Sequence, residues 1–122
     1  MRRTVDRVLR GRRQVDGAGV HLLRVFGRDE AVLMDPFLML DFFDSDRPEE
    51  YEKGFPWHPH RGIDTITCLF EGALDHADSL GNAGVIEGDG CQWMTAGGGL
   101  LHQEMPRRSP RMLGLQLWAN LP

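Results

Sequence analysis

Ile63-Asp64-Thr65-Ile66-Thr67-Cys68-Leu69-Phe70 is rich in β-branched residues and is the clearest predicted strand of the chain. Turn residues at short, regular intervals separate it from other strand-like segments, a rhythm typical of a sandwich or a barrel. No window shows a convincing helical period. The sequence therefore predicts an all-β fold. Further strands are expected at 4–9, 20–26, 37–43, 91–95, 100–105 and 112–118, and turns at 75–78, 81–84 and 87–90.

Length and composition limit the classes of protein to which the chain can belong. The chain has 122 residues, which predicts one domain over 1–122, and its 15 glycines suit an all-β fold with many tight turns. The net charge of −4 gives no reason to expect direct binding to nucleic acid or to a membrane. No apolar run approaches the roughly 18 residues of a membrane span, and no apolar stretch follows the Arg-rich start as in a signal peptide. We therefore expect a cytoplasmic protein.

The redox state of the expected compartment indicates the state of the two cysteines. In a reducing compartment Cys68 and Cys91 are most simply free thiols, with a disulfide as the less favoured alternative. Neither cysteine belongs to a CxxC motif, so a zinc site or a thioredoxin-like site has no support.

Two short motifs, His58-Pro-His60 and His102-Gln-Glu104, carry the strongest functional signal. Side chains at positions i and i+2 of a strand point to the same face, so two neighbouring strands could close a four-ligand site. Imidazole with carboxylate suits iron, manganese, nickel, copper or zinc. The sequence predicts a metal site made of these three histidines and Glu104. The alternative, ordinary surface or core histidines, is the reading we prefer for His21 and His76.

Side chains of the strand that follows His60 point alternately to its two faces, and this alternation predicts further residues near the site. If no bulge intervenes, Asp64 and Cys68 share the inward face of the two histidines. Asp64 would then accept a hydrogen bond that orients an imidazole, or serve as an occasional ligand. Trp57 and Trp93 are candidates for the walls of the pocket, although an aromatic residue in a β-protein is more often part of the core.

Five segments, in order along the chain, closely resemble the pirin family of the cupin superfamily. They are Asp35-Pro-Phe-Leu-Met-Leu-Asp41, Phe55-Pro-Trp-His-Pro-His-Arg-Gly62, Gly88-Asp89, Gln92-Trp-Met-Thr-Ala-Gly97 and Gly99-Leu-Leu-His-Gln-Glu-Met-Pro106. The resemblance implies a cupin double-stranded β-helix, a jelly-roll-like barrel, with one non-haem Fe(II). The family's ligands carry over to His58, His60, His102 and Glu104, the same four residues.

The chain departs from the family pattern in two respects. Members usually have two cupin domains, and this chain ends at Leu121-Pro122, where the first domain normally ends. It therefore corresponds to a single-domain relative or to a fragment, and a homodimer contact could take the place of the second domain. In addition, Asp64 stands where the family more often has Glu.

The resemblance implies one of two functions. The first is a flavonol (quercetin) 2,3-dioxygenase, which acts on a phenolic substrate and O2 and would use Glu104 as its catalytic base. A carboxylate cannot be a firm ligand and a free base at once, so Glu104 would have to shift or share the proton. The alternative is an iron-dependent, redox-sensing regulatory protein that binds a protein partner through the Arg-rich start or the acidic loop at 41–52. Another small enol or phenol substrate also stays open.

Overall fold

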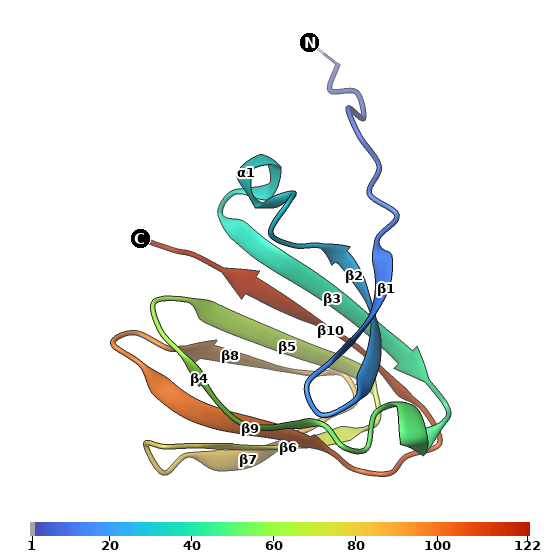
Figure 1. Cartoon of the computed structure of the whole chain (residues 1–122), viewed down its shortest axis with the longest axis vertical. Helices are drawn as coiled ribbons and strands as arrows, with labels where there is room; N and C mark the ends of the chain where they lie inside the picture. The colour runs from blue at the N-terminus through green and yellow to red at the C-terminus, as the bar shows by residue number, and fades with distance from the viewer. Residues whose placement is uncertain (1) are drawn as a thin grey trace.

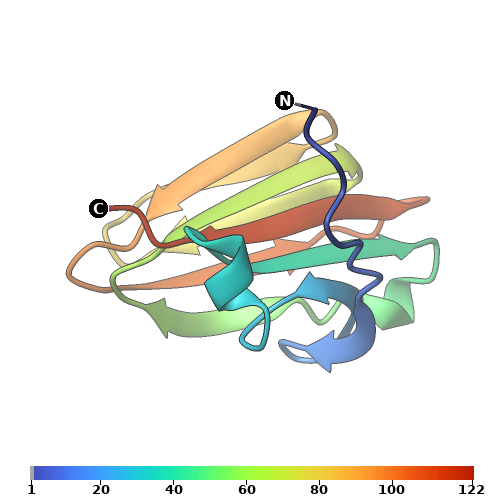
Figure 2. The same ribbon diagram turned by 90° about the horizontal axis from the view of Figure 1, so that it is seen from above.

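Two antiparallel β-sheets face one another in the computed structural model, which describes residues 2–122 (Figure 1; Figure 2 shows the view from above). The larger sheet has the order β1 (Arg12–Asp16), β2 (Val20–Phe26), β3 (Phe37–Ser45), β10 (Met112–Ala119), β5 (Asp64–Glu71), β8 (Gly90–Thr95). The smaller sheet has the order β4 (Phe55–His60), β9 (Leu100–Pro106), β6 (Ala73–Asp78), β7 (Ala83–Glu87). The predicted all-β class is confirmed.

Helical structure is limited to two single turns in the connections. They are α1 (Ala31–Met34) and the 3-10 turn η1 (Pro48–Glu50). Across residues 2–122, no helix has the length and apolar character needed to cross a membrane.

Two local predictions are wrong. Residues 2–11 form neither helix nor strand, although a strand was expected at 4–9. Arg12 is paired with Arg24 and β2 ends at Phe26, so β2 has no residue that could pair with residues 4–9. The N-terminal segment runs away from the sheets in Figure 1. The turn expected at 75–78 is instead part of β6, whose polar residues are held between β7 and β9.

The space between the sheets is divided into an apolar part and a polar part. The apolar cluster comprises Val20, Leu22, Phe43, Tyr51, Leu69, Leu74, Ile86 and Met112. The buried polar residues are Asp41, Thr65, Thr67, His76, His102 and Glu104. Both kinds occur on one strand, because the inward face of β5 carries Thr65 and Thr67 before it reaches Leu69.

The inward face of β5 corrects the predicted alternation. Asp64 was expected inside with His60, but it is Thr65 that is buried. The chain leaves the smaller sheet after His60 and enters the larger one at Asp64. Gly62 between them has a φ of +72°, a backbone conformation that glycine adopts with little strain. This turn resets the alternation. The Asp64 carboxylate accepts a hydrogen bond of 3.0 Å from Nε1 of Trp93, so it orients an exposed indole and no imidazole.

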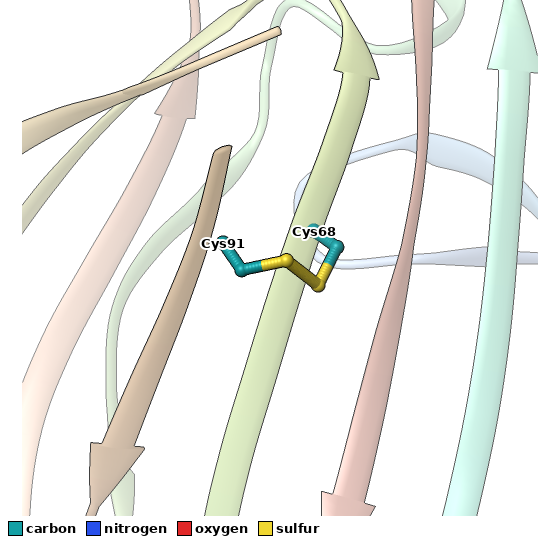
Figure 3. Close-up of a disulfide and its surroundings, with 2 residues drawn as sticks. All are labelled: Cys68 and Cys91. Carbon is teal, nitrogen blue, oxygen red and sulfur yellow. A yellow bond between two sulfur atoms is a disulfide. The ribbon is translucent and has the colours of Figure 1, made fainter. Parts of the chain in front are cut away.

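The two cysteines are joined in a disulfide, so the prediction of free thiols is wrong (Figure 3). Cys68 of β5 stands directly opposite Cys91 of β8, and their Cα atoms are 4.1 Å apart. Opposed residues on adjacent antiparallel strands have side chains close enough to be bridged. The prediction failed because it was drawn from the expected compartment, while the pairing depends on strand register.

Candidate metal centre

The three predicted histidine ligands meet where two strands lie side by side. His58 of β4 stands directly opposite His102 of β9, and His60 follows two residues after His58. The ring centroids are 4.4 Å apart for His58 and His102, and 4.9 Å for each of the other two pairs. One nitrogen from each ring lies within 4.8 Å of the other two. The structure therefore brings these three imidazoles together in a geometry that could hold one metal ion.

The protein environment disfavours the charged form of two of these imidazoles, those of His60 and His102. His102 is only 1% exposed, and its burial, reinforced by His58 and His60, lowers its pKa to about 3. Burial also lowers the pKa of His60, and the neighbouring His58 adds to the effect. Neutral imidazole is the form that binds a metal ion. His60 and His102 can therefore bind a cation near neutral pH without first losing protons.

Hydrogen bonding distinguishes the outer histidine from the inner one. Nδ1 of His58 lies 2.7 Å from the carbonyl oxygen of Pro56. Because a carbonyl can only accept, the ring proton sits on Nδ1 and leaves Nε2 free to bind a metal. Neither ring nitrogen of His102 has a hydrogen-bond partner among residues 2–122. Such buried nitrogens are costly unless they are satisfied, so the residues present fit a metal ion at this position.

Glu104, the fourth predicted ligand, is held by the opposite sheet. It is 2% exposed and follows His102 on the inward face of β9. Thr67 of β5 donates to Oε1 at 2.8 Å, and Gln116 of β10 donates to Oε2 at 2.9 Å. Within the described chain, the cluster of mutually close ligand atoms contains the three imidazoles and not this carboxylate. Glu104 is therefore adjacent to the cluster, with both oxygens engaged.

Several residues of the site were not singled out in the sequence. Thr67 and Gln116 anchor Glu104, and Trp118 packs edge-on against His60 with ring centroids 5.1 Å apart. His76 is buried, with its ring centroid 5.5 Å from that of His102, although a structural or solvent role was preferred for it. One signal could have found it, because His76-Ala-Asp78 repeats the spacing of His102-Gln-Glu104.

An aromatic cleft of about 540 Å³ opens beside the cluster. Its walls include Phe55, Trp57, His58, His60, Gln116 and Trp118. Trp57 thus lines the cleft as predicted, whereas Trp93 lies on the outer face of β8. The volume falls within the usual range for small-molecule sites, and walls of this kind suit a flat, largely apolar ligand.

Known proteins place the chain in a family. The pirin family model matches residues 19–119. A pirin-like protein of Caulobacter vibrioides is 51% identical over 121 residues, which cover 98% of this chain and 44% of that protein. A quercetin 2,3-dioxygenase structure from Acinetobacter baumannii matches with a TM-score of 0.78 and 36% identity, covering 91% of this chain and 41% of the other.

A more distant structure bears on the fold alone. A cupin domain from Schizosaccharomyces pombe matches with a TM-score of 0.61 at 10% identity, covering 90% of this chain and 69% of the other. Together with the two antiparallel sheets, it confirms the predicted cupin fold. The chain spans less than half the length of the C. vibrioides protein and of the A. baumannii chain. On the match over residues 19–119, the chain belongs to the pirin family.

Proposed function

We propose that this chain carries a metal-dependent dioxygenase site of the quercetin 2,3-dioxygenase type, with His58, His60, His102 and Glu104 holding Fe(II). The observation that carries the proposal is His102, whose two buried ring nitrogens meet no protein partner among residues 2–122, while two further imidazoles converge on it. The similarity to the A. baumannii quercetin 2,3-dioxygenase supports the choice of reaction.

The donor set is compatible with iron and with several other divalent metals. Imidazole and carboxylate ligands are common to iron, manganese, nickel, copper and zinc. When bound, the ion would act as a Lewis acid toward a deprotonated phenolic oxygen and would bring O2 close to the substrate. The protein would supply orientation, a partly dry pocket and a place for the proton.

The cleft is suited to hold a flat phenol. Phe55, Trp57 and Trp118 provide apolar surfaces beside His58 and His60. Nε1 of Trp118 is a buried donor that has no acceptor in the part of the chain that the structure describes. A hydroxyl or carbonyl oxygen of the substrate would satisfy this donor and so fix how the ring lies in the cleft.

Glu104 is also the proposed base for the substrate hydroxyl, a role in which it would shift away from the ion or share the proton. The two oxygens of the carboxylate differ in what a proton would meet there. A proton on Oε1 faces the hydroxyl of Thr67, which can turn from donor to acceptor. A proton on Oε2 would face the amide N–H of Gln116, which can only donate. We therefore assign the proton to Oε1, where the network keeps a hydrogen bond after proton transfer.

The test is oxygen consumption by the anaerobically iron-loaded protein after addition of quercetin. We expect uptake in proportion to quercetin, and we expect it to vanish in His102→Ala together with most of the bound iron. His21→Ala is the matched control, because His21 is an exposed histidine on β2 of the larger sheet and is not part of the cluster, and it should behave as wild type. If wild type holds a full equivalent of iron and consumes no oxygen, the redox-sensing regulatory function becomes the better account. If His102→Ala keeps its iron, the proposed ligand set is wrong.

Glu104→Gln tests the base separately. The substitution keeps the shape of the side chain but removes the charge that accepts the proton. We expect turnover to fall at least about 100-fold, as is typical for loss of a general base, with a much smaller change in the urea midpoint. Turnover equal to wild type would remove Glu104 from this role.

A further inference from the structure

The inner and outer histidines of the cluster differ in what lies behind them. A histidine that binds a metal through one nitrogen normally donates its other N–H to an acceptor, which fixes the ring and strengthens it as a ligand. His58 has such an acceptor in the carbonyl of Pro56. His102 has none among residues 2–122, although it is the most deeply buried of the three. A metal-bound His102 would therefore need an acceptor from a neighbouring residue.

His76 is the neighbour that can supply an acceptor. It lies on β6, directly beside β9, and its ring centroid is 5.5 Å from that of His102. The side chain is buried, and Nδ1 has no hydrogen-bond partner within residues 2–122. A neutral imidazole carries one lone pair on a ring nitrogen. Nδ1 of His76 can therefore accept a hydrogen bond from a ring N–H of His102, provided that the proton of His76 is on Nε2.

Asp78 favours that arrangement of the proton. Its Oδ2 lies 3.8 Å from Nε2 of His76, so the negative charge favours a proton on Nε2 over one on Nδ1. The carboxylate is itself fixed by Leu80 N at 2.9 Å and by Asn82 through both its backbone and its side-chain nitrogen. The side-chain hydrogen bond from Asn82 is the main cause that lowers the pKa of Asp78, which keeps it charged.

We propose that His76 is a positioning residue of the metal centre. Nδ1 of His76 accepts a hydrogen bond from the ring N–H of His102 that faces away from the ion, and Asp78 orients His76 in turn. This inference rests on the proposed function, because it requires His102 to bind the ion. The two rings are not hydrogen-bonded to each other as they stand, so the contact forms by a small rotation of a ring or through one bridging water. His76 then fixes which nitrogen of His102 faces the ion.

Two substitutions at His76 separate hydrogen bonding from packing. His76→Phe keeps a ring of similar size but has no acceptor, whereas His76→Asn places an amide oxygen near the position of Nδ1. We would titrate each metal-free protein with cobalt(II) and record both the dissociation constant and the visible absorption of the bound ion. His21→Phe is the matched control on an exposed histidine.

We expect His76→Phe to bind cobalt(II) about 10- to 100-fold more weakly than wild type, with shifted absorption bands, because the ring of His102 loses its support. His76→Asn should recover most of the affinity and the wild-type spectrum. Equal behaviour of the two variants, whether both bind normally or both bind weakly, would overturn the inference. A wild-type protein that binds no metal would overturn the proposed function as well, so the two failures are distinguishable.

A second measurement does not depend on how well the variants fold. Nitrogen-15 NMR of the zinc-loaded wild-type protein reports which ring nitrogen of each histidine carries the proton. We expect His76 to be protonated on Nε2 and not on Nδ1. A proton on Nδ1 of His76 would exclude it as an acceptor and overturn the inference.

Discussion

The apolar and polar parts of the interior lie between the same two sheets but have opposite effects on the free energy of folding. The apolar cluster around Leu69 and Met112 removes hydrocarbon from water, which is the dominant favourable term in folding. The polar part buries His76, His102 and Glu104, and each such group costs free energy unless it finds a partner. The apolar part therefore stabilises the fold, whereas the unsatisfied groups of the polar part depend on a ligand.

Not every buried polar residue remains unsatisfied. Asp41 is held by two hydrogen bonds of 2.8 Å from Arg24, and Glu104 is held by Thr67 and Gln116. Unsatisfied nitrogens are found on His76 and His102, and on Trp118 beside the cleft. The free energy cost is therefore concentrated where we propose that the metal and the substrate bind, so metal binding should stabilise the folded protein.

Replacing His102 should produce the largest effect and should act on binding. His102→Leu removes a proposed ligand, so metal affinity should fall by more than the 10- to 100-fold typical of losing an outer hydrogen-bond partner. The same change deletes two buried nitrogens without partners in the described chain, so the metal-free variant should be as stable as wild type, or up to about 3 kcal/mol more stable. Metal titration and urea unfolding of the metal-free proteins test both parts. A metal-free variant much less stable than wild type would mean that His102 stabilises the fold.

Truncating the apolar cluster should give the opposite pattern. Leu69 is 1% exposed, so Leu69→Ala should lower the free energy of unfolding by about 2–5 kcal/mol. The affinity of the folded protein for metal should change little. Leu80→Ala, at an exposed leucine, is the matched control and should leave the urea midpoint near the wild-type value. A large loss of metal affinity in Leu69→Ala would show that the two parts are energetically coupled.

Removing the disulfide should lower the free energy of unfolding and should leave metal affinity unchanged. Cys68 and Cys91 are 23 residues apart, and a crosslink of that span stabilises by about 3 kcal/mol, chiefly by restricting the unfolded chain. The double variant Cys68→Ser, Cys91→Ser should therefore unfold at lower urea with unchanged metal affinity. Wild type in a reductant should match it. Equal midpoints for the oxidised and reduced proteins would contradict the expectation.

Lowering the pH should reduce the free energy of unfolding of the metal-free protein, because the polar part contains His60 and His102, whose pKa values are lowered in the folded state. The ordinary histidine pKa is 6.5, and folding lowers that of His102 to about 3 and also lowers that of His60. Between these values the unfolded chain takes up protons that the folded protein does not, so stability should fall as the pH falls below 6.5 and should be independent of these groups above it. Each group contributes at most about 1.4 kcal/mol per pH unit. Urea midpoints from pH 7 to pH 4 should fall less in His102→Leu than in His21→Leu, and equal slopes would contradict the assignment.

Local patterns in the sequence were enough to predict many of the strands and the three clustered histidines. The spacing of His58 and His60 needs only the two-residue repeat of a strand, and the structure places both beside His102. The β2 strand was predicted with its observed bounds because turn residues separate it from the strand before it. What the sequence could not supply was the relation between distant segments. The reversal at Gly62, the pairing of Cys68 with Cys91 and the burial of His76 all depend on it.

The strand that carries His58 and His60 is the outermost strand of its sheet, and this has a consequence for assembly. Two of the six residues of β4, Pro56 and Pro59, have no backbone N–H. A strand from another molecule would therefore find an interrupted row of donors along this edge, and such edges resist runaway sheet-to-sheet aggregation. Strand addition is therefore a disfavoured way to cover the neighbouring cleft. The two prolines thus place both histidines beside a cleft whose neighbouring sheet edge disfavours extension by another strand.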